Sequence, residues 1–271
     1  MHAVAVHDGV IVASAGDPAL VAFLRSAAKP IQALPVARAR ADLTEEEVAI
    51  SCASHLARPD QLEHVRSLLA KAPATEGELE CGPEPTRIEH NCSGKHAAML
   101  ALCRARDWPS EGYRLLGHPC QGTMLAEVSA AAEVEPTTVP TAVDGCGVVT
   151  FALPLERMAH AFSRLEALEG GERVVRAMRA HPELVRGPGA ADVTLMRALA
   201  GWVAKLGAEG LLCASAPDGL GVAIKAEDGA TRAPGVALAS FLARLGIDAG
   251  ALAEAPLESS RGDVVGELRA S

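Results

Sequence analysis

The chain has 271 residues, of which 49% are hydrophobic and 22% charged, with a formal net charge of -9. These proportions are typical of a globular protein with a sizeable core, and they offer no basic surface to a nucleic acid. No apolar stretch is long and uncharged enough to span a membrane, and the first residues lack a charged signal segment, so we expect a cytoplasmic protein. The cysteine count of seven is odd, which favours reduced thiols over a disulfide framework.

Turn, capping and periodicity signals predict an α+β fold. Two short strands alternate around the turn His7-Asp8-Gly9, and a capping box at Thr44 opens the first clear helix. The predicted helices cover residues 44–53, 60–69, 93–106, 121–132, 154–165, 191–206 and 236–245. The predicted strands cover residues 3–6, 10–14, 210–214, 221–226 and 263–268, with loops at 73–85 and 249–262. We therefore expect a mixed sheet, built from both ends of the chain and flanked by helices, in a single domain over residues 1–271.

Lysine is scarce in this chain. There are 20 Arg and only five Lys. Because Arg cannot give up its proton in a protein, a Lys is required wherever a neutral amine does chemistry. Lys71 and Lys205 have the neighbours of solvated surface residues, whereas Lys29, Lys95 and Lys225 lie in unusual surroundings.

Two stretches could supply an activated hydroxyl. Ser26 precedes Lys29 by three residues, which places both on one face of a helical turn, although Pro30 is expected to push Lys29 out of the α region. Ser54 lies in a polar cluster at the end of a helix, and Lys225 ends an apolar strand, where desolvation lowers an amine pKa. The plainer alternatives are a capping Ser, a polar helix end and a Lys that reaches water.

Two further stretches could bind a ligand or metal. Residues 90–96 contain the only Asn and one of the five Lys, and they open an apolar helix whose N-terminus favours an anion. Cys146 lies between two glycines, which let the backbone approach a ligand closely, although a Gly-rich turn with a buried thiol is the alternative. The G-x-S-x-G, H-E-x-x-H and Cys-x-x-Cys motifs are absent, and so are the S-D-N and K-T-G partners of a β-lactamase Ser-x-x-Lys.

Six stretches in order resemble the Rhizobium-type (class 3) L-asparaginase family: RSAAKPIQALP, CASH, HNCSGKHAAML, DGCGVVTFALPL, MRAHPELVRGPG and GLGVAIK. The resemblance implies a fold similar to serine β-lactamases and glutaminases, a homodimer, and hydrolysis of L-asparagine to L-aspartate and ammonia. It implies two serine–lysine pairs, Ser26 with Lys29 and Ser54 with Lys225. It also implies an auxiliary zinc site at Cys92, Lys95 and Cys146, with Asp144 and His96 nearby. In one departure, Ala190 stands where the family usually has a basic residue.

The predicted function is therefore an amidohydrolase with an acyl-serine intermediate. Ser26 is expected to attack with Lys29 as base while Ser54 and Lys225 move the proton, and the reverse choice of nucleophile stays open. Arg25, Asp144 and His96 are the substrate-binding candidates, the first two by charge alone. The alternatives are an acyl-serine hydrolase of glutamine or a β-lactam, and a non-catalytic amino-acid-binding relative.

Overall fold

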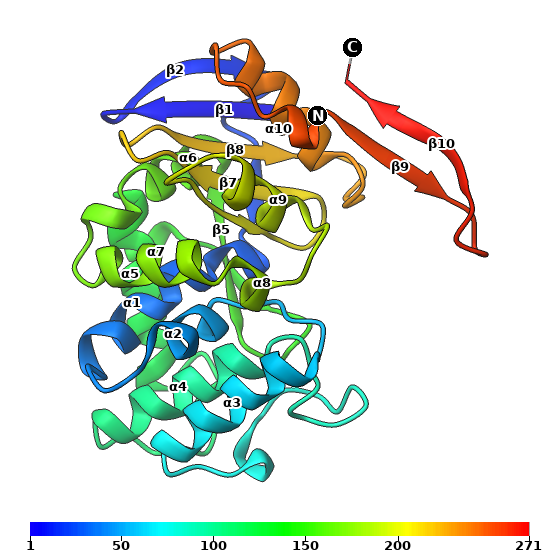
Figure 1. Ribbon diagram of the computed structural model, residues 1–271. Coiled ribbons are helices and arrows are strands. Elements are labelled where there is room, and N and C mark those ends of the chain that lie inside the picture. The colour runs from blue at the N-terminus through cyan, green and yellow to red at the C-terminus, as the bar shows by residue number, and fades with distance from the viewer. Residues whose placement is uncertain (271) are drawn as a thin grey trace.

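The computed structural model describes residues 1–270 (Figure 1). Its main sheet has five strands in the order β2-β1-β8-β7-β6. These strands are β1 (His2–His7), β2 (Val10–Ala15), β6 (Val203–Leu206), β7 (Leu211–Ser215) and β8 (Gly221–Lys225). Strand β1 pairs with β8, so the sheet joins the start of the chain to strands late in the sequence, as predicted. The last predicted strand, over residues 263–268, lies in a separate two-stranded sheet. The α+β class is confirmed. The sheets are antiparallel rather than mixed, because every strand pairing within residues 1–270 is antiparallel.

The turn between β1 and β2 has the geometry that its residues indicate. Asp8 and Gly9 have φ values of 50° and 76°. Positive φ at both central residues is typical of the tight hairpin turns whose twist matches that of the strands.

Two helices cover the centre of the sheet. Helix α6 (Leu155–Ser163) packs against β1, β7 and β8, and α10 (Pro234–Ala243) packs against β7 and β8. Every residue of β7 and β8 is buried, so both faces of these strands are covered. A Cβ at Gly221 would lie 2.0 Å from the carbonyl oxygen of Ala159 in α6, so this close approach requires glycine.

The other helices form a second region below the sheet in the view of Figure 1, except for the last of them along the chain, which packs against the edge strand β6. They are α1 (Lys29–Ala39), α2 (Glu45–Ser51), α3 (Pro59–Lys71), α4 (Ser93–Ala105), α5 (Pro119–Ala132), α7 (Gly171–Ala180), α8 (Pro182–Val185) and α9 (Ala191–Ala198). The capping box that opens α2 is confirmed, with Thr44 accepting from the Glu47 N–H. Helix α1 is buried from Lys29 to Ala37 and contacts α2, α4, α5 and α7, so it is the central helix of this region.

Short elements link the two regions. A small sheet has the order β3 (Val21–Phe23), β5 (Val149–Pro154), β4 (Thr141–Val143). The 3-10 turns are η1 (Arg25–Ala28), η2 (Glu76–Glu78), η3 (Pro136–Thr138), η4 (Leu165–Ala167) and η5 (Gly250–Leu252). Strand β3 leads directly into η1, which continues into α1. No helix within residues 1–270 is long and apolar enough to cross a membrane.

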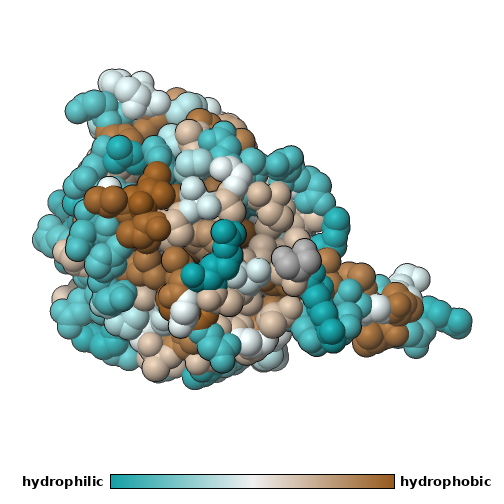
Figure 2. Space-filling view, turned by 90° about the horizontal axis from the view of Figure 1, so that it is seen from above, coloured by the Kyte–Doolittle hydropathy of each residue, from teal (hydrophilic) through white to brown (hydrophobic). Residues whose placement is uncertain are grey.

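Two predicted segments differ from the structure. The helix predicted over residues 191–206 ends at Ala198 and is followed by β6, because Gly201, at a φ of 79°, turns the chain. Part of the loop predicted over residues 249–262 is strand β9 (Glu254–Glu258), which pairs with β10 (Val264–Arg269) apart from the main sheet. Figures 1 and 2 show this hairpin reaching away from the rest of the molecule, with apolar and polar side chains on its surface.

Candidate functional site

The predicted residues converge where η1, the segment after α2 and the end of β6 meet. Arg25, the first residue of η1, has a φ of 49°, a left-handed conformation that non-glycine residues seldom adopt outside constrained sites. A Cβ at Gly207, just after β6, would lie 2.9 Å from the Leu24 carbonyl oxygen. The end of β6 therefore lies directly against the turn that carries Ser26.

The hydroxyl of Ser54 lies between two lysine amines. Its Oγ is 2.9 Å from the Nζ of Lys29 and 3.1 Å from the Nζ of Lys205. Ser54 is 2% exposed and both lysines are fully buried. Both amines are placed to donate to this oxygen, which has two acceptor lone pairs and one proton of its own. Ser54 can therefore take a proton from one lysine amine and give its own to the other, so it is placed to pass a proton between them.

The partner of Ser54 is Lys205 and not Lys225. The Nζ of Lys225 donates to the carbonyl oxygens of Glu209 and Ala226, at 2.6 and 2.7 Å. The predicted Ser54–Lys225 pair is therefore wrong, and so is the prediction that Lys205 is solvated. The reason is topological: β6 is the sheet edge that contacts η1, α7 and α9, whereas β8 lies two strands further into the sheet.

Lys205 has the electrostatic surroundings of a base. Burial lowers its pKa to about 8; Asp192 opposes this effect, and the charges of Lys29 and Arg186 add to it. An appreciable fraction of Lys205 is therefore neutral near neutral pH, which is uncommon for a lysine. Neither Lys205 nor Asp192 was recognised in the sequence. Two features of the sequence point to Lys205: lysine is scarce in this chain, and this lysine lies within the apolar run Trp202–Leu206.

A histidine ties the Ser54 segment to helix α4. The Nδ1 of His55 accepts from the Ala57 N–H at 3.1 Å, so its Nε2 carries the proton and donates to the Ser93 Oγ at 2.7 Å. Burial lowers the pKa of His55 to about 4, so the ring is neutral. The hydroxyl of Ser93 in turn donates to the Ile88 carbonyl oxygen. This fixed network holds Ser54 in place beside the start of α4.

Ser26 is half-buried and lies three residues before Lys29. Within residues 1–270 no hydrogen bond joins the two, because the Lys29 amine is directed to Ser54 and the Ala53 carbonyl oxygen. Lys29 has helical φ and ψ values of -57° and -41°, so the expectation that Pro30 would move it out of the α region is wrong. Proline is well tolerated in the first turn of a helix, where its missing N–H is not needed.

Arg25 and Asp144, the two charged substrate-binding candidates, contact each other. The Nε of Arg25 donates to an Asp144 carboxylate oxygen at 2.5 Å, and an Nη bonds Glu209. Burial would raise the pKa of Asp144, but Lys95 and Arg25 lower it further than burial raises it. Asp144 is therefore ionised, and opposite charges lie side by side next to Ser26.

The predicted metal ligands come together. The Nζ of Lys95 is 3.1 Å from the Sγ of Cys146. A hydrogen bond from Cys92 and the charge of Lys95 lower the pKa of Cys146 to about 5, against the effect of burial. Burial opposes ionisation of Lys95, but the neighbouring cysteines and Asp144 raise its pKa, so an ammonium faces the Cys146 thiolate.

Two sulfurs and an amine are a donor set that suits zinc, provided that the ion displaces the Lys95 proton. In the described part of the chain, no group of three His, Cys, Asp or Glu could hold a metal, so Lys95 is indispensable to such a site. His96, predicted nearby, is fully buried; its Nδ1 bonds the Tyr113 hydroxyl at 2.7 Å, and its Nε2 has no hydrogen-bond partner among residues 1–270.

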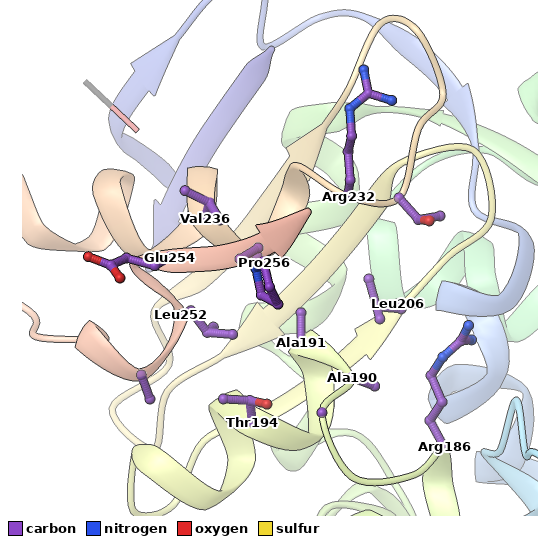
Figure 3. A pocket seen from close by; sticks show the side chains of 15 residues that line it. Arg186, Ala190, Ala191, Thr194, Leu206, Arg232, Val236, Leu252, Glu254 and Pro256 are labelled. Carbon is purple, nitrogen blue, oxygen red and sulfur yellow. The ribbon is translucent and has the colours of Figure 1, made fainter. Parts of the chain in front are cut away.

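A cavity of about 440 Å³ lies beside this site, between the starts of α9 and α10 and strand β9 (Figure 3). Leu206 and Arg186 line it, together with Ala190. None of the predicted catalytic residues lines it. Arg186 therefore brings a basic side chain to the same cavity as Ala190, the position at which the resemblance predicts a basic residue.

Comparison with known proteins assigns the family. The family model for L-asparaginase II matches residues 1–270, which are all the residues that the structure describes. No curated protein sequence matches the chain. Because the match covers the whole described chain, the protein belongs to the L-asparaginase II family, a family named for amide hydrolases that act on an amino acid.

Proposed function

We propose that the protein hydrolyses L-asparagine to L-aspartate and ammonia through an acyl-serine intermediate, as a Rhizobium-type (class 3) member of the asparaginases. The observation that carries the proposal is the Ser54 hydroxyl held between the amines of Lys29 and Lys205. A serine bridging two buried amines suits proton transfer during amide cleavage.

Ser26 is the better nucleophile of the two serines. It is half-buried and can meet a substrate, whereas Ser54 is 2% exposed and its hydroxyl is already engaged. In the proposed reaction, the Ser26 oxygen bonds to the side-chain carbonyl carbon and its proton passes to Lys29. Catalytic contacts often tighten only when substrate binds, so the present orientation of Lys29 toward Ser54 is compatible with this step.

The proton then reaches the leaving nitrogen. Ser54 gives its proton to the amide nitrogen and is reprotonated from the lysine amines, so the carbon–nitrogen bond breaks and ammonia leaves. Water then attacks the Ser26 ester and gives a proton to a neutral lysine amine, either Lys29 or, through Ser54, Lys205. That proton passes to the Ser26 oxygen as its bond to the acyl carbon breaks, so aspartate leaves and the serine is regenerated. Lys225 has no part in this relay, because its amine bonds backbone carbonyls.

The Arg25–Asp144 pair supports an amino-acid substrate. A zwitterion carries a carboxylate and an ammonium close together, and the pair offers the complementary charges next to Ser26. Arg25 would contact the α-carboxylate and Asp144 the α-ammonium.

Zinc is proposed as an auxiliary ion held by Cys92, Lys95 and Cys146. When bound, it would supply a Lewis acid beside the substrate-binding pair. The Ser26 and Ser54 chemistry does not depend on it. A homodimer and a cytoplasmic location remain predictions.

Ammonia release tests the proposal. Purified protein is assayed with asparagine, glutamine and a β-lactam; asparagine should be the best substrate, and Ser26→Ala should lose about 10³-fold or more in kcat. Ser163→Ala, outside the site, serves as the control. Binding of asparagine without ammonia release would instead identify a non-catalytic relative. Loss in Ser54→Ala with retention in Ser26→Ala would exchange the roles of the two serines.

A further inference from the structure

A buried carboxylate lies behind Lys205. Asp192, in the first turn of α9, is fully buried, as is Lys205. One Asp192 oxygen accepts from the Leu206 N–H at 3.0 Å and lies 3.5 Å from the Lys205 Nζ. The other accepts from the Val193 N–H at 3.1 Å. Asp192 thus holds the strand that carries Lys205 and also faces the lysine's amine.

The charges around Lys205 differ in sign. Lys29 in α1 and Arg186 after α8 face it with positive charge, and the thiol of Cys52 lies close by after α2. Asp192 is the only carboxylate within salt-bridge distance of Lys205 in residues 1–270. A buried ammonium without a paired anion is strongly disfavoured. Without Asp192, the cationic neighbours and burial would all favour neutral Lys205.

The carboxylate is not placed to meet a substrate. Its polar contacts are the Lys205 amine and two backbone N–H groups. Ala191 and Leu206 line the cavity of Figure 3, whereas Asp192 does not. Any effect of Asp192 on the reaction must therefore pass through Lys205 to Ser54.

We propose that Asp192 is a positioning residue that holds Lys205 against Ser54 and sets the pH at which this lysine loses its proton, and so the pH at which the relay begins to work. The inference rests on the proposed function, because it concerns the same relay. It assigns to Asp192 an electrostatic role distinct from that of the two backbone hydrogen bonds that it accepts.

Asp192→Asn separates the two roles. The amide oxygen keeps an acceptor for the Leu206 N–H, while the charge facing Lys205 is removed. The acidic limb of the kcat/KM profile should move to lower pH by about one unit or more, since an opposite charge at this distance shifts a pKa by about one to three units. Asp192→Glu, which keeps the charge, should return the limb toward that of the wild type. Asp60→Asn, which removes an exposed carboxylate bonded to Arg58, should leave it unchanged.

The outcomes separate this inference from the proposed function. If wild-type protein hydrolyses asparagine and Asp192→Asn has an unmoved acidic limb, the role of Asp192 is overturned and the serine relay stands. If neither Ser26 nor Ser54 is needed for turnover, the proposed function itself fails.

A measurement of thermal stability tests the inference if Asp192→Asn is too unstable for kinetics. If an unpaired Lys205 charge is what harms Asp192→Asn, then adding Lys205→Met should raise the Tm above that of the single variant or restore folding. A double variant no more stable than Asp192→Asn would show that Asp192 serves only its backbone contacts and would overturn the inference.

Discussion

Replacing Lys205 by Met should remove most asparagine hydrolysis, whereas Lys225→Met should remove little. The Lys205 amine lies 3.1 Å from Ser54 Oγ, while the Lys225 amine bonds two carbonyl oxygens at the end of the sheet. General acid–base groups contribute about 10²- to 10⁴-fold to a rate, so we expect kcat to fall by at least about 10²-fold for Lys205→Met. For Lys225→Met, the change in kcat should be within about threefold.

The two substitutions also differ in stability. Lys205→Met leaves the buried Asp192 without its cation, and breaking such a pair costs about 3–5 kcal/mol. Lys225→Met leaves two carbonyl oxygens without their lysine donor. Each unsatisfied oxygen costs about 1–3 kcal/mol of stability if water cannot take the place of the amine. The ammonia assay is therefore run well below the Tm of each variant, as measured by thermal denaturation. A folded Lys205→Met protein with near wild-type kcat, or a 10²-fold loss confined to Lys225→Met, would refute the assignment of Lys205.

Three further results are expected. Since burial lowers the pKa of Lys205 to about 8 and the relay through Ser54 needs its neutral amine, kcat/KM should rise as pH increases through about 8; a maximum near pH 5 would contradict this. Elemental analysis of protein purified without chelator should find about one zinc per chain. The variant Cys146→Ser should lose this zinc, and the control Cys213→Ser, within β7, should retain it; equal zinc in both variants would place the ion elsewhere. Gly94→Ala should lower the free energy of unfolding in urea by about 3 kcal/mol or more, since the new Cβ would lie 2.1 Å from the Ile50 carbonyl oxygen. The control Gly82→Ala, whose Cβ would meet no described atom within 4 Å, should change that free energy little.

The features that the sequence predicted correctly depend on neighbours along the chain. The β1–β2 turn needs only Asp8-Gly9, and the start of α2 needs only Thr44 with Glu47 three residues later. These signals act within one turn of backbone, so they can be identified without knowing the rest of the fold. Lys95 also contacts Cys146, where the family resemblance implies a zinc site, and that site stays a prediction.

The errors concern long-range packing. The apolar residues after Ala191 fit a helical period, and the break between α9 and β6 is a short turn that contains Gly201 at positive φ. This difference moves Lys205 from a helix end to a sheet edge next to η1. Ser54 and Lys205 are 151 residues apart in the chain, so no local spacing indicates that they meet. The hairpin β9–β10 was missed in part because it lies apart from the main sheet.

Labelling of the nucleophile tests the central claim most directly. A diazoketone analogue of asparagine, which alkylates an attacking hydroxyl, is incubated with the wild-type protein, and the modified residue is located by peptide mass spectrometry. The proposed mechanism predicts a label on Ser26. Excess aspartate should suppress this labelling, and it should be slower in the Ser54→Ala and Lys205→Met variants. A label on Ser54, or on a residue outside the Ser26, Lys29, Ser54 and Lys205 group, would contradict it.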